Sequence, residues 1–551
     1  MKRTPSLLFY GTIGLFMAAF LAYPLWGVFE RAFFFTGSFS PGLFLATLSG
    51  SHTQQILINS CVLGFAAVLL SACIAVPLAF FIARYDFTLK RVVSGLVLVP
   101  MILPPFVGAI GIQRIFARHG LVNMVFDIAP FDWFSWSGFW GVAFLQALHL
   151  FPIMYLNMTA ALANIDQGLE EAAKTAGAKP FAVFKDITLP LALPGFFSGA
   201  VIVFLWSFTD LGTPLVLGFR QVVAVEIFDR STAINNDPSG PALVVCVILV
   251  TALFMGIMRR FSAKEVLGGS KGSRGALVQK PSKTMLACIY GFFLFVLCLS
   301  LLPHFGLVLT SLAKDWFMTA LPAEYTLDYF ETALSYKGIV LSVKNSLVYS
   351  SCSTLIDVVF GLGLAWFLVR KKVRGAWLID AVVMLPIALP GIILAFGYLA
   401  AFSGTILDPL QNPAPLLIIG YAVRRLPYSF RAAYAGLQQV SPEFEEAAQV
   451  SGAGSVRTIT TITVPLIGAN IVAGAILAFI FALLEVSESM ILAVKEQFFP
   501  LTREIYHLLG KIPDGDYIAS ALGVLCMFLL AAGLAGASAI MGKHLGKMFR
   551  V

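Results

Sequence analysis

Long apolar runs alternate with short polar segments along the whole chain. A helix needs about 20 apolar residues to cross the bilayer core. Runs of this kind occur at roughly 7–29, 57–83, 94–116, 138–160, 194–217, 241–258, 284–312, 345–369, 377–402, 414–435, 468–494 and 518–541. The pattern therefore predicts an all-α polytopic membrane protein with about twelve transmembrane helices.

One polar segment occurs twice. The first copy has Glu170, Glu171, Ala172, Ala173, Gly177 and Pro190, and the second has Glu445, Glu446, Ala447, Ala448, Gly452 and Pro465, each 275 positions later. Earlier in the chain, Asn59 and Pro100 match Asn345 and Pro386 at an offset of 286. Such spacing indicates an internal duplication. We expect two homologous six-helix halves, 1–258 and 284–551, joined by a linker at 259–283 rich in Gly, Ser and Lys.

Each copy of the repeated segment has the features of a short, well-ended helix. Asp166 and Ser441 are good N-cap residues, and the alanines have high helix propensity. Gly177 and Gly452 stand where the chain must turn, often at positive φ. The prolines then suit the first turn of the next membrane helix. The segment is thus predicted to be a rigid element attached to a membrane helix.

Composition and charge agree with this topology. Apolar residues make up 59% of the chain and charged residues only 12%, too few for a soluble domain. The net charge of +8 does not indicate nucleic-acid binding, because Lys and Arg fall in alternate loops rather than on one face. The positive-inside rule places both termini, both repeated segments and the linker in the cytoplasm.

No catalytic or metal-binding motif stands out in the sequence. There is no Walker A motif, no zinc-ligand spacing and no Ser/His/Asp arrangement, and the seven cysteines lie in apolar runs. His149 and His304 are each isolated among apolar residues, which favours satisfied core histidines. The chain is therefore not expected to be an enzyme, to bind a cofactor itself or to hold a firmly assigned metal.

The repeated segment resembles the Glu-Ala-Ala loop of the membrane subunits of bacterial ATP-driven importers. The resemblance implies that the residues of both copies quoted above form coupling helices, each docked in a cleft of a separate ATPase. It also implies two copies of that cytoplasmic ATP-binding subunit, which carry ATP and Mg, an extracytoplasmic solute-binding protein and a location in the bacterial inner membrane.

The fused halves resemble the ferric-iron permeases in particular, with thiamine and phosphonate permeases as relatives. The stretches Phe151–Leu156, Thr209–Pro214 and Arg424–Tyr428 carry this resemblance. A secondary transporter is the alternative class, because it too can have two halves and twelve spans. A sensor or structural membrane protein is a third possibility. Neither alternative accounts for two loops suited to docking a motor.

Carboxylates at matching positions form a candidate translocation path. Asp210 and Glu485 are 275 positions apart, and Glu488 lies one turn beyond. Charged residues within a span usually face a cavity or a partner. Their oxygens would suit a hard cation such as ferric iron, whereas an anionic phosphonate would rely on Arg424 and Arg425. Alternatively, these carboxylates are hydrated at the outer interface or paired with arginines, and thus structural.

Overall fold

The computed structural model is almost entirely helical. It describes residues 4–35, 37–116, 120–125, 138–231, 237–262, 279–371, 375–510 and 512–541. In these ranges the only strands are β1 (Ala313–Asp315) and β2 (Glu324–Tyr325), which pair antiparallel. The middle of the predicted linker, residues 263–278, lies outside the described residues.

The helices agree closely with the predicted spans. Among the described residues, eight helices are long and apolar enough to cross a membrane, and three further bent pairs bring the number to eleven. The twelfth predicted span, 414–435, coincides with α20 (Ala414–Gln439). This helix lacks the apolar character of the others because it carries Arg424, Arg425 and Arg431. The bent pairs break after Met101, Ile387 and Leu466, by 91°, 95° and 82°.

The chain forms two compact units. The first-half unit comprises the described residues of Ser51–Glu226 and Cys246–Tyr329. Its helices are α4 (Ser51–Arg84), α5 (Lys90–Leu96), α6 (Pro105–Phe116), α7 (Leu121–Val125), α8 (Phe139–Ala163), α9 (Gln167–Thr175), α10 (Pro180–Val183), α11 (Leu189–Phe208), α12 (Gly212–Val216) and α15 (Lys283–Leu312). The helix α4 buries Leu63, Ala67 and Leu78 and exposes Phe65 and Leu69, so it has one packed side and one side suited to lipid.

The second-half unit comprises the described residues of Met1–Gly50, Ile227–Val245 and Phe330–Met548. Its helices are α1 (Thr4–Met17), α2 (Tyr23–Phe33), α3 (Pro41–Ser49), α17 (Lys337–Lys371), α18 (Ala376–Ala388), α19 (Gly391–Phe402), α20, α21 (Glu443–Val450), α22 (Ser455–Thr458), α23 (Val464–Leu466), α24 (Gly468–Leu483), α25 (Ser487–Leu492), α26 (Leu501–Leu508) and α27 (Gly515–Met541). The helices α13 (Val223–Arg230), α14 (Ser239–Ser262) and α16 (Asp328–Ser335) contain the positions at which the division falls.

The compact units differ from the sequence halves because the first helices are exchanged. In the first-half unit, α15 crosses α6 so closely that a Cβ on Gly306 would lie 2.3 Å from the carbonyl oxygen of Gly111. In the second-half unit, a Cβ on Gly397 of α19 would lie 3.1 Å from the carbonyl oxygen of Pro24 in α2. Glycine permits both approaches. The halves 1–258 and 284–551 thus describe the sequence repeat, whereas compact packing places α1 and α2 with the second half and α15 with the first.

Candidate functional site: coupling helices and buried polar clusters

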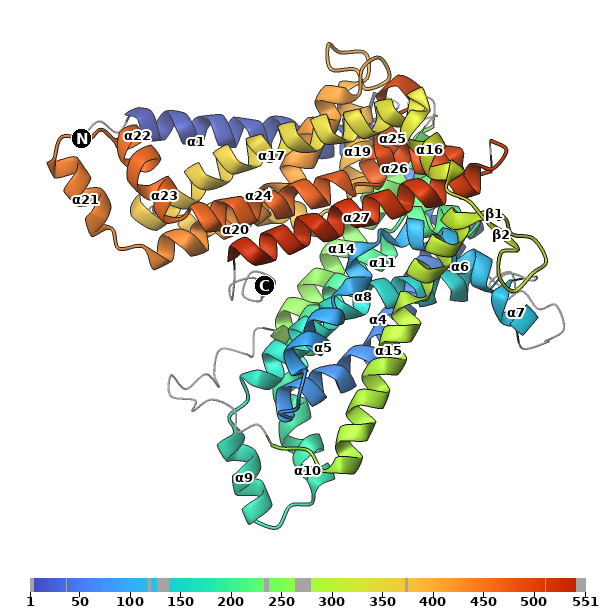
Figure 1. Cartoon of the computed structure of the whole chain (residues 1–551). Coiled ribbons are helices and arrows are strands. Elements are labelled where there is room, and N and C mark those ends of the chain that lie inside the picture. The colour runs from blue at the N-terminus through green and yellow to red at the C-terminus, as the bar shows by residue number, and fades with distance from the viewer. Residues whose placement is uncertain are drawn as a thin grey trace. The chain divides into compact units, whose positions relative to one another are not determined.

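The first repeated segment forms the helix α9, at one end of the long helices of its unit (Figure 1). The side chain of Asp166 accepts a hydrogen bond from the backbone N–H of Gly168 at 2.9 Å, as expected for the N-cap. Gly177 has a φ of +87°, and the following N–H, of Ala178, bonds back to the carbonyl of Ala173 at 3.0 Å. The predicted left-handed end of the helix is therefore present.

The second repeated segment forms α21 in the same way, at one end of the long helices of the second-half unit (Figure 1). Gly452 has a φ of +90°, and the N–H of Ala453 bonds to the carbonyl of Ala448 at 3.0 Å. The hydroxyl of Ser441 accepts from the N–H of Glu443 at 3.4 Å. The helix begins at Glu443, so Pro442 occupies the N-cap position and the predicted N-cap, Ser441, lies one residue earlier.

The two glutamates of each copy have different surroundings. Glu171 and Glu446 are exposed, whereas Glu170 and Glu445 are buried, with 9% and 4% of their surface exposed. Of the alanines, Ala172 and Ala447 are exposed and Ala173 and Ala448 are half-buried, and Pro190 and Pro465 lie exposed in the first turns of α11 and α23. The first glutamate of each copy therefore does not face outwards as a docking residue would.

Glu170 is held inside the first-half unit. It forms an ion pair with Arg84, the last residue of α4. The hydroxyl of Thr188 donates to the Glu170 Oε1 at 2.6 Å. Thr188 ends a five-residue π-helix, Phe184–Thr188, directly before α11.

Glu445 is held in the same manner in the second-half unit. The Arg370 Nε donates to its Oε1 at 3.1 Å, and the Thr463 hydroxyl donates to the same oxygen at 3.0 Å. The indole N–H of Trp366 donates to the other oxygen, Oε2, at 3.0 Å. Thr463 ends a second π-helix, Ile459–Thr463, 275 positions after the first. The two arginines could have been found from the sequence, since Arg84 and Arg370 are 286 positions apart and both end an apolar run.

Each repeated segment, which runs from its helix to the following proline and is called a coupling segment from here on, also exposes apolar side chains at matching positions. Leu169 and Phe444 are 50% and 57% exposed, and Phe181 and Val456 are 74% and 76% exposed. Both pairs are 275 positions apart. Polar loops rarely expose large apolar side chains without a partner, so these residues extend the candidate docking surface beyond the predicted motif.

The second-half unit contains a buried cluster of charges. The Arg424 Nη1 donates to the Glu485 Oε2 at 2.6 Å, and Arg425 pairs with the same carboxylate. Arg424 also lies 3.6 Å from the Oε1 of Glu488, which is fully buried. Gly420 makes room here, because a Cβ would lie 2.5 Å from the Glu488 Oε2. The pairing with arginines that the sequence left as an alternative is therefore observed for Glu485.

The matching positions of the first-half unit hold a carboxylate whose described partners are uncharged. Asp210 accepts from the Gln146 Nε2 at 3.0 Å and from the N–H of Gly212 at 3.1 Å. The hydroxyl of Ser207 donates to Gln146. His149 and Leu150 occupy the positions equivalent to Arg424 and Arg425. The structure thus places Asp210 and Glu485 alike, each just past the end of a membrane helix, but gives guanidinium partners only to Glu485 among the described contacts.

A further buried carboxylate was missed by the sequence reasoning. Asp357, on α17, has no exposed surface, and neither of its oxygens accepts a hydrogen bond from a described residue. Ser71 is its counterpart at the 286 offset. The signal that could have found it is a single acid inside the apolar run 345–369.

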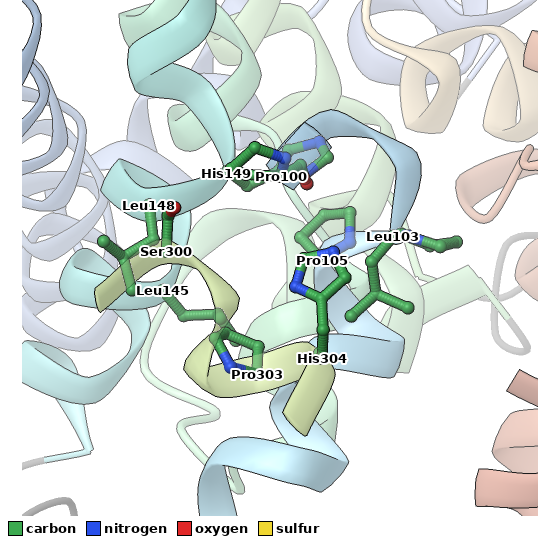
Figure 2. Close-up of a pocket in the computed structure, with 11 residues that line it drawn as sticks. Pro100, Leu103, Pro105, Leu145, Leu148, His149, Ser300, Pro303 and His304 are labelled. Carbon is green, nitrogen blue, oxygen red and sulfur yellow. The ribbon is translucent and has the colours of Figure 1, made fainter. Parts of the chain in front are cut away.

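The two isolated histidines lie at one pocket of the first-half unit (Figure 2). The pocket is lined largely by prolines and leucines of the broken segment between α5 and α6, of α8 and of α15. The His149 Nδ1 lies 3.2 Å from the carbonyl oxygen of Pro100, which fits a satisfied core histidine. Neither ring nitrogen of His304 makes a hydrogen bond of ordinary geometry with the described residues. No group of three or more His, Cys, Asp or Glu could hold a metal ion in the part of the chain described.

Comparison with known proteins identifies the family. Residues 75–267 and 357–542 both match the binding-protein-dependent transport system inner membrane component. Similar proteins include the ferric transport system permease protein FbpB of Actinobacillus pleuropneumoniae, 26% identical over 95% of this chain and 76% of the relative. A putative ferric transport system permease protein of Haemophilus influenzae is 26% identical over 87% of this chain and 76% of the relative. A molybdenum transport system permease protein of Mycobacterium tuberculosis is 29% identical over 38% of this chain and 80% of the relative.

The chain belongs to this family of binding-protein-dependent transport components, and it contains the family domain twice. It is an importer permease, a multi-pass membrane component rather than an enzyme. Membership implies that it works with an ATP-binding subunit and a solute-binding protein.

Proposed function

Because the chain belongs to this family, we propose that it is the membrane subunit of an ATP-driven importer of ferric iron. Support for iron comes from the ferric permeases, whose similarity extends over 95% and 87% of this chain and thus over both halves. The observation that carries the ATP-driven mechanism is the pair of coupling helices. Both α9 and α21 present an exposed glutamate beside an exposed apolar side chain at matching positions.

Each coupling helix would dock on one copy of a cytoplasmic ATPase, which binds ATP and Mg. The two docking surfaces are alike enough to accept two identical subunits, since Glu171 matches Glu446 and Leu169 matches Phe444. A solute-binding protein would deliver iron from outside. Both termini and the linker would lie on the cytoplasmic side of a bacterial inner membrane, as the positive-inside rule favours.

Orientation is tested by labelling a cysteine placed at Ser270 in the linker. In a variant whose seven native cysteines have been replaced, a membrane-impermeant thiol reagent should label Ser270→Cys only after the cells are opened. Labelling in intact cells would reverse the assigned orientation.

Within the membrane, Asp210 is a better candidate than Glu485 for contact with passing iron. Glu485 is already neutralised by two arginines, whereas Asp210 accepts hydrogen bonds from a neutral amide and a backbone N–H. A carboxylate without a cationic partner can offer its charge to a hard cation. Iron is the cargo here, and its residence at Asp210 would be transient.

An oxyanion such as molybdate is the second candidate cargo. The similarity to molybdenum permeases favours it, as do the half-buried Arg424 and the buried Arg425. Against it, the similarity covers only 38% of the chain, and both arginines are paired with Glu485.

Reconstitution tests the proposal. The chain is placed in liposomes with an ATP-binding subunit that co-purifies with it and a solute-binding protein, and uptake of radioactive ferric iron, molybdate, phosphonate and thiamine is measured with and without ATP. Iron uptake that requires ATP, with the ATPase co-purifying, is the expected result. Uptake driven by an ion gradient without the ATPase would show a secondary transporter, and ATP-dependent uptake of another solute would replace iron as the cargo.

A further inference from the structure

The buried glutamates of the two coupling segments have partners of the same kind. In each copy an arginine comes from the end of a long helix earlier in the same unit, α4 or α17, and a threonine comes from the start of the next membrane helix. We call Arg84, Glu170 and Thr188 the first latch, and Arg370, Glu445 and Thr463 the second latch. The two sets occur in separate compact units, so the arrangement is observed twice independently.

Both latches include the same backbone irregularity, a π-helix. Phe184–Thr188 and Ile459–Thr463 have the same length, lie 275 positions apart and end at the latch threonine. A π-turn inserts one residue into a helix, so the side chains beyond it are rotated by about 100° relative to an uninterrupted α-helix. The direction from which the threonine reaches the glutamate is therefore set by an irregularity that both copies share.

We propose that Glu170 and Glu445 are positioning residues that fix each coupling helix to two membrane helices at once. This inference rests on the proposed function, because it assigns the route by which a docked motor moves the membrane helices. A helix of eight or nine residues is marginal alone, and its covalent connection to the following membrane helix passes through a glycine turn. The latch adds an attachment through side chains to the end of α4 in the first copy or α17 in the second. The coupling helix therefore moves as one body with that helix and with the following membrane helix.

The buried ion pair suits this role. Arg84 and Glu170 each have 11% of their side-chain surface exposed, and Arg370 and Glu445 have 11% and 5%. Removing one partner of such a pair leaves a charge that water reaches poorly. Opening a latch is therefore costly, and the coupling helix follows its membrane helices rather than detaching from them.

The second latch has more partners than the first. Glu445 also accepts from Trp366, and Arg370 also donates to the carbonyl of Val440 at 3.0 Å. The position equivalent to Trp366 in the first half is Phe80, which has no donor. Loss of the carboxylate should therefore leave more side chains unpartnered in the second copy than in the first.

Hydrogen exchange of the isolated chain in detergent tests the latch without needing transport. In Glu170→Ala, the amides of residues 167–175 should exchange about tenfold faster, because the helix loses its buried anchor. Glu171→Ala, at the exposed neighbouring position, is the matched control and should leave that exchange unchanged. Glu445→Ala and Glu446→Ala repeat the comparison over residues 443–450. Equal exchange in both members of each pair would overturn the proposal.

Transport in the reconstituted complex gives the second readout. Glu170→Ala and Glu445→Ala should still bind the ATPase and support hydrolysis, while the solute imported per ATP falls about tenfold, a coupling loss within the usual range. Glu170→Gln, which can still accept the Thr188 hydrogen bond, should recover part of this loss. If the alanine variants instead release the ATPase with unchanged exchange, the glutamates are docking contacts and the proposal is wrong.

The two readouts separate this inference from the proposed function. If the wild-type chain imports nothing with ATP and binds no ATPase, the proposed function fails. The exchange comparison then still decides whether the buried glutamates anchor their helices.

Discussion

Replacing Glu485 by glutamine tests whether its carboxylate is primarily a counter-ion or a ligand for the cargo. In the native chain Glu485 accepts from Arg424 at 2.6 Å and pairs with Arg425, and it is only 6% exposed. Glutamine keeps the size and one acceptor oxygen but removes the negative charge. Arg424 then has Glu488 at 3.6 Å as its nearest acid, and Arg425 keeps a 2.9 Å bond to the carbonyl of Phe481.

The structure gives the expected size of the effect. Removing one partner of a buried ion pair costs about 3–5 kcal/mol. An unpaired arginine within a span costs about 2.5–3.5 kcal/mol on the insertion scale. Because Glu488 remains near Arg424, we expect Glu485→Gln to lower the free energy of unfolding by about 3 kcal/mol, at the lower end of the first range.

A second substitution separates stability from transport. Arg424→Gln added to Glu485→Gln restores the charge balance of the cluster, so thermal unfolding in detergent should return most of the way to the native midpoint. If Glu485 is only a counter-ion, iron uptake per folded molecule should recover with it. If uptake stays lost while stability returns, the cluster acts on the cargo directly. An unchanged unfolding midpoint in Glu485→Gln alone would refute the ion-pair reasoning, and Asp210→Asn, which removes a charge without stranding an arginine, is the comparison for uptake.

Three further substitutions test other parts of the structure. Gly452→Val should reduce ATP-dependent uptake while membrane insertion persists, because φ is +90° there and a side chain in this left-handed conformation costs about 1–2 kcal/mol. Gly454→Val is the control: Gly454 has no positive φ, and at both glycines a Cβ would meet nothing within 4 Å, so this variant should be tolerated in the same uptake assay. Gly306→Ala should lower the unfolding midpoint, because its Cβ would lie 2.3 Å from a backbone oxygen and overpacking costs about 1–3 kcal/mol or more. Gly291→Ala is the control on the same helix and should leave the midpoint unchanged, because its Cβ would meet no atom within 4 Å. Burial and the charge of Glu496 raise the pKa of Glu504 in α26, although the hydrogen bond from Ser342 lowers it. Protonated Glu504 therefore favours the folded state below the ordinary glutamate pKa, and this contribution is lost as pH rises through the pKa of the folded state. Glu504→Gln should flatten the pH dependence of unfolding just above the ordinary glutamate pKa, and an unchanged profile would contradict the burial argument.

The parts predicted well from the sequence depend on local signals. Long apolar runs have one low-energy solution in a bilayer, the helix, so the spans were placed correctly even where Pro100 and Pro386 lie near breaks. The positive φ values at Gly177 and Gly452 also followed from local chemistry, because only a residue without a Cβ takes that turn at no cost.

The parts that were missed depend on contacts between distant residues. The exchange of α15 and of α1 with α2 includes close approaches between residues far apart in the chain, such as that of Gly306 to Gly111, and glycine is common enough in membrane helices to give no signal by itself. The inward direction of Glu170 depends on an arginine 86 residues earlier in the chain. The motif placed both glutamates on one helix, but only the packed structure distinguishes the buried one from the exposed one.

The two copies are alike in their coupling segments but differ in the polar groups buried among their membrane helices. The coupling segments repeat in detail, from the glycine turns to the π-helices and the arginine–glutamate–threonine latches. The membrane interior does not: Glu485 has two arginines, while Asp210 has a glutamine and backbone at the equivalent place. Two identical ATPase subunits would require two equal docking surfaces, whereas a single cargo passing once through the chain requires no such symmetry. Equal coupling ends joined to unequal interiors are therefore what the proposed importer needs of one fused polypeptide.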